Sequence, residues 1–311
     1  FQNIDIMHRH SPDYVIVLGG DHIYTMDYSK MLMHHVRSEA DLTVGCIEVP
    51  CEEARGFGVM SVDDELNIIK FTEKPAAPDS IPGKPGTALA SMGIYIFSTS
   101  FLYNALMRDA EDENSSNDFG RDIIPNSIKN NKAVAYPVLN EEGEPAFWRD
   151  VGTIDSYWEA NLDLCSIDPE LNLYDRNWPV WTYQTQHPPA KFIFDDEGRR
   201  GEAIDSMVAG GVIISGARVK RSIIFFGTTV NNYSHIKDSV ILPKVTVGKN
   251  CRLLKCVIDK GCYIADGTEI GVDPEEDRRR GFYITENGVT LVTPDMLGQN
   301  LFTGILPGSG E

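Results

Sequence analysis

Residues 218–271 read RVKRSIIFFGTTVNNYSHIKDSVILPKVTVGKNCRLLKCVIDKGCYIADGTEIG, and an aliphatic residue recurs there at every fifth or sixth position. The intervals run 5, 6 and 6 residues and then start again, which gives a period of 17. A second column, formed by Ser222, Ser239 and Cys256, keeps the same period. The ten aliphatic positions of the repeat are Val219, Ile224, Val230, Ile236, Ile241, Val247, Leu253, Ile258, Ile264 and Ile270.

This hexapeptide periodicity predicts a parallel β-helix over residues 206–272. Each coil of such a helix has three short flat faces, and the inward aliphatic side chain of each face stacks on its equivalent one coil away. A four-stranded antiparallel sheet is the alternative. It would show alternation with turn dipeptides rather than a steady period of 17. We expect residues 273–311 to form a charged cap and a tail.

Residues 1–174 alternate strand and helix patterns, which predicts an α/β domain with a mostly parallel, Rossmann-like sheet covered on both faces. Such sheets bind ligands where loops leave the carboxyl ends of the strands. The apolar segment Tyr14–Leu18 resembles a buried central strand, and it lies so near residue 1 that we expect the domain to be truncated at its start. Residues 175–205 lose the helix signals and predict a linker.

The composition of the 311 residues restricts the class of protein. Lys and Arg number 28 against 46 Asp and Glu, so the net charge is −18, and no basic stripe is present. Neither nucleic acid nor an anionic membrane is therefore an expected partner. No apolar run approaches the roughly 18 residues of a spanning helix. The six cysteines form no CxxC pair, and we expect reduced thiols and a cytoplasmic protein.

Two carboxylates stand where such a sheet binds ligands. Gly19-Gly20-Asp21 follows the strand Tyr14–Leu18, and Asp150 lies in Trp148–Thr153, just before a predicted helix. Two such acids suit one Mg²⁺ ion, which prefers few carboxylates together with phosphate oxygens. Asp21 as a simple cap of the following segment is the alternative, and the spacing alone does not say that the two acids meet.

Two further segments offer groups for a sugar phosphate. Phe71–Pro75 places Lys74 at the end of a strand, where a point charge suits a phosphate. The alternative is that Glu73 and Lys74 are simply an exposed charge pair at a turn. Ser91-Met92-Gly93 presents a hydroxyl and a bare backbone to a sugar, or else forms an ordinary strand edge.

Taken together, these segments resemble a known family, bacterial glucose-1-phosphate adenylyltransferase, also called ADP-glucose pyrophosphorylase. The resemblance extends over nearly the whole chain, to about residue 297. It rests on the order of the following motifs: GDHIY at 20–24, GFGVM at 56–60, FTEKP at 71–75, SMGIYIF at 91–97, NDFGRDIIP at 117–125 and WRDVGT at 148–153.

The resemblance implies a nucleotidyltransferase domain followed by a left-handed β-helix, in a homotetramer that serves glycogen or glucan synthesis. It implies that ATP and α-D-glucose 1-phosphate react to give ADP-glucose and pyrophosphate. Carried over by position, Asp21 and Asp150 resemble the Mg²⁺ ligands and Lys74 the cation at the sugar phosphate. Glu73, Gly58 and Ser91 resemble sugar-binding residues.

The chain departs from the family pattern in places that bear on function. The N-terminal glycine-rich segment with its Arg, and the base-binding residues expected near it, do not occur in this chain, so we expect residues 1–311 alone to be inactive. Lys244 and Lys260 fall where relatives bind AMP through an acid and an arginine, which leaves an allosteric role in doubt. No Lys or Arg follows Thr293, although members activated by fructose 1,6-bisphosphate carry basic residues there.

Three other functions stay open at this stage. One is a nucleotidyltransferase for another nucleotide or sugar, and a second is a noncatalytic regulatory subunit of the same fold. The third is an acyltransferase, because hexapeptide coils often build acetyl-CoA sites with a catalytic His. His235 is the only histidine inside the repeat.

Overall fold

A computed structural model describes residues 2–196 and 198–299. The chain divides into two compact units, Phe1–Asp150 and Val151–Glu311. The domain limits predicted above, at residues 174, 205 and 272, follow composition rather than contacts and stay a prediction. The predicted tail beyond residue 299 lies outside the described residues.

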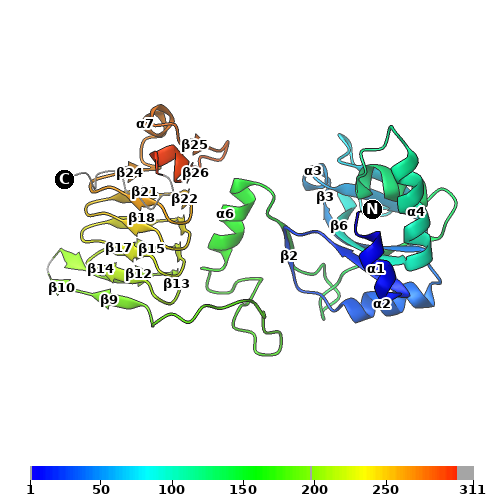
Figure 1. The fold of residues 1–311 in the computed structure, drawn as a ribbon, viewed down its shortest axis with the longest axis horizontal. Coiled ribbons are helices and arrows are strands. Elements are labelled where there is room, and N and C mark those ends of the chain that lie inside the picture. The colour runs from blue at the N-terminus through cyan, green and yellow to red at the C-terminus, as the bar shows by residue number, and fades with distance from the viewer. Residues whose placement is uncertain (1, 197, 300–311) are drawn as a thin grey trace. The chain divides into compact units, whose positions relative to one another are not determined.

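The first unit is built on a six-stranded sheet with helices on both faces (Figure 1). Its elements in chain order are α1 (Ile4–His10), β1 (Tyr14–Leu18), β2 (His22–Tyr24), α2 (Tyr28–Arg37), β3 (Leu42–Pro50), α3 (Cys51–Ala54), β4 (Gly58–Val62), β5 (Ile68–Glu73), β6 (Thr87–Ser98), α4 (Thr99–Glu111), the π-helix η1 (Phe119–Ile123), α5 (Ile124–Ser127), β7 (Ala133–Pro137) and β8 (Trp148–Asp150).

Strand order in this sheet is β5-β4-β6-β3-β7, and β1 also pairs with β6. The predicted mostly parallel pairing needs correction, because β3 and β7 are the only parallel neighbours within the described part of the sheet. The strand β6 is antiparallel to β1, β3 and β4 and lies between them, so strands of one direction are separated. Strand and helix patterns give the order of elements along the chain but not the order of strands across the sheet.

Two apolar cores flank this sheet, as the expectation of helices on both faces requires. Met31 of α2 packs with Ile94 and Ile96 on one side, whereas Phe101 and Leu102 of α4 pack on the other. The strand β1 differs from the predicted buried strand. It pairs only with β6 among the described residues, and its alternate side chains Tyr14, Ile16 and Leu18 are exposed.

Most of the second unit is a parallel β-helix. Its elements are α6 (Ile154–Asp163), β9 (Lys191–Ile193), β10 (Asp195–Asp196), β11 (Arg199–Arg200), β12 (Glu202–Ile204), β13 (Met207–Val208), β14 (Ile213–Ser215), β15 (Arg218–Lys220), β16 (Ile223–Ile224), β17 (Thr229–Val230), β18 (His235–Lys237), β19 (Val240–Ile241), β20 (Thr246–Val247), β21 (Arg252–Leu254), β22 (Cys256–Ile258), β23 (Tyr263–Ile264), β24 (Glu269–Ile270), α7 (Pro274–Arg279), β25 (Tyr283–Ile284), β26 (Thr290–Val292) and the 3₁₀ helix η2 (Asp295–Leu297).

The coils stack in the register that the repeat predicts, one face above another (Figure 1). Val219 lies opposite Ile236, which lies opposite Leu253, so neighbouring coils are 17 residues apart. All ten aliphatic positions of the repeat are at most 1% exposed and belong to one core cluster. The prediction of a parallel β-helix is therefore confirmed at the level of individual residues.

Buried hydroxyl groups line one inner corner of the coils. The Ser222 hydroxyl accepts a hydrogen bond from the backbone N–H of Ser239, and the Ser239 hydroxyl accepts one from the N–H of Cys256. A buried N–H group without a partner is costly, and the corner hydroxyls provide that partner at each coil. The second column of the 17-residue repeat is thus explained by hydrogen bonding rather than by apolar packing.

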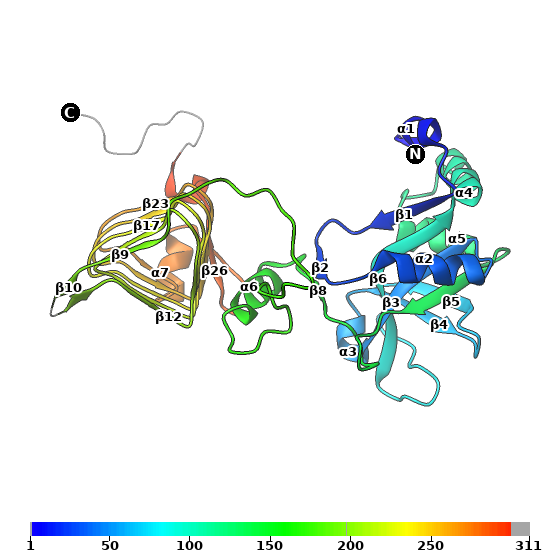
Figure 2. The ribbon, with the colours of Figure 1, turned by 90° about the horizontal axis from the view of Figure 1, so that it is seen from below.

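The helix α6 packs against the outside of the coils within the second unit (Figure 2). Thr153 caps it, since its side chain accepts from the N–H of Ser156 in a capping box. The indole N–H of Trp158 donates to the backbone oxygen of Asp238 at 2.8 Å, and Leu162 packs on Val240 and Val257. The apolar face of this helix therefore contacts the β-helix.

Within residues 2–196 and 198–299, none of the helices combines the length and the apolar character needed to cross a bilayer.

Ile241→Ala tests the inward column, because Ile241 is completely buried in the core of the coils. We expect this truncation to lower the free energy of unfolding by about 2–5 kcal/mol, through lost burial and the cavity that remains. Ile204→Ala is the control on the same β-helix, since Ile204 is 50% exposed, and it is expected to cost less than about 0.5 kcal/mol. Urea denaturation followed by circular dichroism measures both. Equal losses would contradict a stabilising inward column.

Candidate active site

A two-stranded antiparallel ribbon brings the two predicted acids together. In this ribbon β2 pairs with β8, and His22 lies directly opposite Asp150. Side chains opposite each other on paired strands stand within reach of one another. Asp21, which immediately precedes β2, joins them, so that one ligand atom from each of Asp21, His22 and Asp150 lies within 4.8 Å of the other two.

His22 is held firmly beside these acids. Its Nδ1 lies 2.7 Å from the backbone oxygen of Met92, and its ring packs edge-on against Trp148 with centroids 5.3 Å apart. Its Nε2 lies 3.6 Å from Oδ1 of Asp21. This histidine belongs to the GDHIY motif, and no role was predicted for it from the sequence. The signal available was its position next to an acid at the start of a strand.

The chemistry of this donor set fits a divalent cation. Carboxylate oxygens are the protein ligands that Mg²⁺ and Mn²⁺ prefer, and an imidazole nitrogen suits several first-row divalent ions. Asp21 is well exposed, with 66% of its side-chain surface accessible, whereas His22 is mostly covered at 17%. An incoming phosphate therefore has access to the acid side of the group.

Glu73, predicted to bind sugar, lies in a space that two glycines leave open. A Cβ atom at Gly58 would lie 2.9 Å from Oε2 of Glu73, and a Cβ at Gly120 would collide with the same oxygen. Burial raises the pKa of Glu73, and the nearby Asp118 carboxylate raises it further, while Lys74 and Arg121 act in the opposite direction. Gly58 and Glu73 are also cross-strand partners of β4 and β5.

Ser91 is buried on β6 and is already hydrogen-bonded within the protein. Its hydroxyl donates to the Tyr95 hydroxyl at 3.4 Å and accepts from the N–H of Gly93 at 3.2 Å. The Tyr95 ring stacks on Phe119 with centroids 5.9 Å apart. Ser91 therefore holds Tyr95 and the backbone of Gly93, the glycine that faces His22, in place. Direct contact of Ser91 with a sugar remains a prediction.

Lys74 is exposed at the end of β5 and is linked to the acids through a short series of contacts. Its backbone has a positive φ of 45°, and its N–H donates to the Phe57 oxygen at 3.0 Å. The Phe57 ring packs on Trp148 at 4.8 Å, and Trp148 packs on His22. Lys74 is thus linked through Phe57 and Trp148 to His22 of the acidic group.

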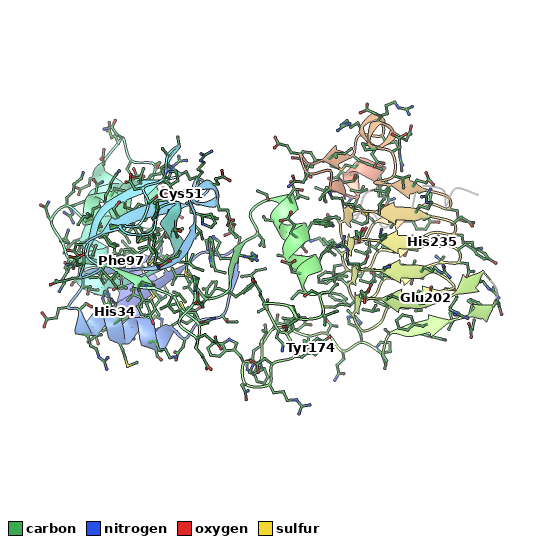
Figure 3. The ribbon with its side chains drawn as sticks, turned by 180° about the vertical axis from the view of Figure 1, so that it is seen from behind. His34, Cys51, Phe97, Tyr174, Glu202 and His235 are labelled. Carbon is green, nitrogen blue, oxygen red and sulfur yellow. The ribbon has the colours of Figure 1, made fainter. Side chains whose placement is uncertain are left out.

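The remaining predicted residues belong to the second unit. Lys244 and Lys260 are exposed at turns of successive coils, where Lys244 donates its N–H to the Phe226 oxygen and Gly261 donates to the Pro243 oxygen. His235 faces outward from β18 between Arg218 and Arg252 of the adjacent coils (Figure 3). Relatives are expected to bind AMP through an acid and an arginine. Among residues 2–196 and 198–299, no ion pair between an acid and an arginine is described that includes residue 244 or 260.

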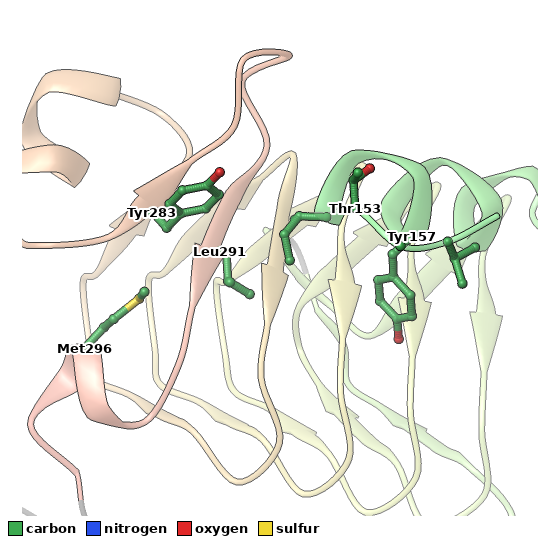
Figure 4. Close-up of a pocket in the computed structure, with 8 residues that line it drawn as sticks. Thr153, Tyr157, Tyr283, Leu291 and Met296 are labelled. Carbon is green, nitrogen blue, oxygen red and sulfur yellow. The ribbon is translucent and has the colours of Figure 1, made fainter. Parts of the chain in front are cut away.

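A hollow of about 650 Å³ lies in the second unit between the start of α6 and the strands β25 and β26 (Figure 4). Its walls contain neither a carboxylate nor a cation and therefore lack the charges that phosphates require. We assign it no catalytic part. The residues that line it are Val151, Gly152, Thr153, Ile154, Tyr157, Tyr283, Leu291 and Met296.

Comparison with known proteins agrees with this division into a nucleotidyl transferase part and a hexapeptide part. A family model described as nucleotidyl transferase matches residues 1–167, and one described as GlmU-like, C-terminal hexapeptide, matches residues 188–292. The predicted nucleotidyltransferase domain and the predicted hexapeptide β-helix are thereby confirmed, while the pairing within the first sheet is corrected as described above.

Relatives extend over nearly the whole chain. A protein of Thiobacillus denitrificans named glucose-1-phosphate adenylyltransferase is 64% identical over 302 residues, which cover 97% of this chain and 69% of that protein. One of the same name from Hydrogenovibrio crunogenus is 66% identical and is covered to 71%. A third, from Dechloromonas aromatica, is 54% identical over 98% of this chain and 70% of its own length.

Glu73→Gln tests the burial of the Glu73 carboxylate. A raised pKa means that the folded state binds this proton more tightly than the unfolded state, so the ionised group destabilises the fold once the pH exceeds both pKa values. We expect Glu73→Gln to raise the urea midpoint at pH 8, and the gain to disappear as the pH falls below the ordinary value of 4.5. Glu65→Gln, at an exposed turn, is the control and should change little. A lower midpoint for Glu73→Gln at pH 8 would contradict this account.

Proposed function

Because the chain belongs to the glucose-1-phosphate adenylyltransferases, within the nucleotidyl transferase family, we propose that it transfers the adenylyl group of ATP to α-D-glucose 1-phosphate. An oxygen of the sugar phosphate forms a bond to the α-phosphorus of ATP. The bond from that phosphorus to the bridging oxygen breaks, and pyrophosphate leaves. The products are ADP-glucose and pyrophosphate, and ADP-glucose serves glycogen or storage-glucan synthesis.

One observation carries this proposal for the first unit: ligand atoms of Asp21, His22 and Asp150 gather within 4.8 Å. Nucleotidyl transferases generally use a divalent metal ion, and we propose Mg²⁺, held by Asp21 and Asp150. Such an ion, when bound, neutralises phosphate charge and polarises the phosphorus that is attacked. The acids would hold the ion at a fixed position, so the phosphates that bind the ion would be aligned without further reorganisation.

The sugar phosphate is proposed to lie toward the ends of β4 and β5. Lys74 neutralises its phosphate, and the exposed ammonium at a strand end suits a ligand that enters from solvent. Glu73 accepts hydrogen bonds from sugar hydroxyls, and its carboxylate occupies the room that the missing side chains of Gly58 and Gly120 leave. The Ser91 hydroxyl fixes the nearby backbone by accepting a hydrogen bond from the N–H of Gly93.

Assembly and regulation complete the proposal. We propose a homotetramer, which light scattering of the purified chain tests directly. Lys244 and Lys260 are proposed to take part in binding a phosphate-bearing effector, since both are exposed cations at turns of neighbouring coils.

Asp21→Asn, Asp150→Asn and Lys74→Met test the assignment by calorimetric titration of the 311-residue chain with α-D-glucose 1-phosphate and Mg²⁺. We expect Lys74→Met to weaken sugar-phosphate binding about 10- to 100-fold, as the loss of a charged hydrogen bond predicts. Each Asp→Asn change should weaken Mg²⁺ binding by at least about tenfold. His235→Ala is the control and should change neither affinity.

Two comparisons separate this function from its rivals. Galactose 1-phosphate and mannose 1-phosphate should bind more weakly than glucose 1-phosphate, and equal binding would contradict the sugar assignment. A loss of binding in His235→Ala would favour a site on the coils instead. Formation of ADP-glucose by residues 1–311 would overturn the separate expectation that this chain alone is inactive, while supporting the reaction itself.

A further inference from the structure

The ring orientation of His22 is set by its hydrogen bond to Met92. A backbone oxygen can only accept, so Nδ1, at 2.7 Å from it, carries the proton and donates. In the neutral ring Nε2 then holds a lone pair, and this atom faces Oδ1 of Asp21 at 3.6 Å. That separation is too long for a hydrogen bond but suits two ligands of one ion. Metal-binding histidines commonly donate their other ring N–H to a backbone oxygen in this way.

The surrounding backbone is shaped to the imidazole. A Cβ atom at Gly93 would lie 2.7 Å from Cε1 of His22, and one at Gly19 would lie 3.0 Å from Nδ1. Gly93 also has a positive φ of 67°, which side-chain-bearing residues rarely adopt. Two glycines and the edge-on Trp148 ring therefore fix the place of the imidazole.

Strand register fixes the position of His22 relative to Asp150. His22 lies directly opposite Asp150 in the β2–β8 ribbon, so the imidazole and this carboxylate belong to one cross-strand pair. A histidine that merely filled the space between Trp148 and Gly93 would not need its second nitrogen among carboxylate oxygens. A ring nitrogen of His22 and a carboxylate oxygen of each acid lie within 4.8 Å of one another, and Nε2 is 3.6 Å from Oδ1 of Asp21. Packing alone leaves this gathering unexplained.

We propose that His22 is a third protein ligand of the divalent ion, through Nε2, alongside Asp21 and Asp150. This inference rests on the proposed function, because it concerns the ion that the nucleotidyl transfer requires. It gives the site a selectivity that two carboxylates alone would not have. An imidazole nitrogen raises affinity for Mn²⁺ and Co²⁺ relative to Mg²⁺, which prefers oxygen ligands.

Two substitutions divide the roles of the two ring nitrogens. His22→Asn places an amide N–H near the position of Nδ1, so it keeps the bond to Met92 but removes the donor at Nε2. His22→Gln reaches the position of Nε2 with an amide oxygen but gives up the bond to Met92. His8→Asn, on the exposed helix α1, is the matched control.

The measurement is pulsed electron paramagnetic resonance of Mn²⁺ added to the 311-residue chain, together with calorimetric titration of Mn²⁺ and Mg²⁺. We expect nitrogen-14 modulation from a directly bound imidazole in the wild type and in His8→Asn, and none in either His22 variant. The preference for Mn²⁺ over Mg²⁺ should fall at least about tenfold in His22→Asn. If His22 served packing alone, Mn²⁺ affinity would be kept by His22→Asn, which retains the bond to Met92, and lost by His22→Gln, which gives that bond up.

The remaining outcomes separate this inference from the function on which it rests. If Mn²⁺ binds, if its affinity depends on Asp21, and if its spectrum shows no nitrogen modulation, the role of His22 is overturned and the proposed function still stands. Modulation that persists in both His22 variants would overturn it equally. Mn²⁺ affinity that is unchanged in Asp21→Asn and Asp150→Asn would remove the metal assignment of the proposed function, and the role of His22 with it.

Discussion

Three backbone pairs between β2 and β8 hold the candidate active site together. They join His22, Ile23 and Tyr24 to Asp150, Arg149 and Trp148, segments that lie at opposite ends of the first unit's sequence. A slip of one residue in this ribbon would turn Asp150 to the opposite face and away from the imidazole. The packing of Trp148 against both Phe57 and His22 opposes such a slip. Register, rather than any single charge, is therefore the constraint on which the chemistry depends.

The β-helix could be predicted residue by residue because its repeat is local. Each coil contacts its neighbours 17 residues away, so the burial of Val219, Ile236 and Leu253 follows from spacing alone. The first sheet gave no such signal. The insertion of β6 between β1 and β3 is a long-range arrangement, and alternation of strands and helices predicts the elements without their pairing.

The candidate site could be predicted only in part: better than the pairing of the first sheet, but less completely than the β-helix. Residue type and position at strand ends selected Asp21, Asp150 and Lys74, but the convergence of the two acids depends on a pairing that no local pattern encodes. His22 was missed because its role depends on which of its nitrogens is occupied. That is decided by the Met92 oxygen and by space at Gly93, both on β6 and far from His22 in sequence. Sequence reasoning thus finds acids by their type, whereas the third ligand requires coordinates.

Charge explains why such a site needs a cation at all. The chain carries a net charge of −18, and the proposed substrates are themselves strongly anionic. Their phosphates would have to approach Asp21, Asp150 and the partly buried Glu73, near which Lys74 and Arg121 lie. A divalent ion held between the acids and the phosphates would convert this repulsion into attraction. A neutral imidazole is then the suitable third ligand, because it adds a donor to the ion without adding negative charge against the incoming phosphates.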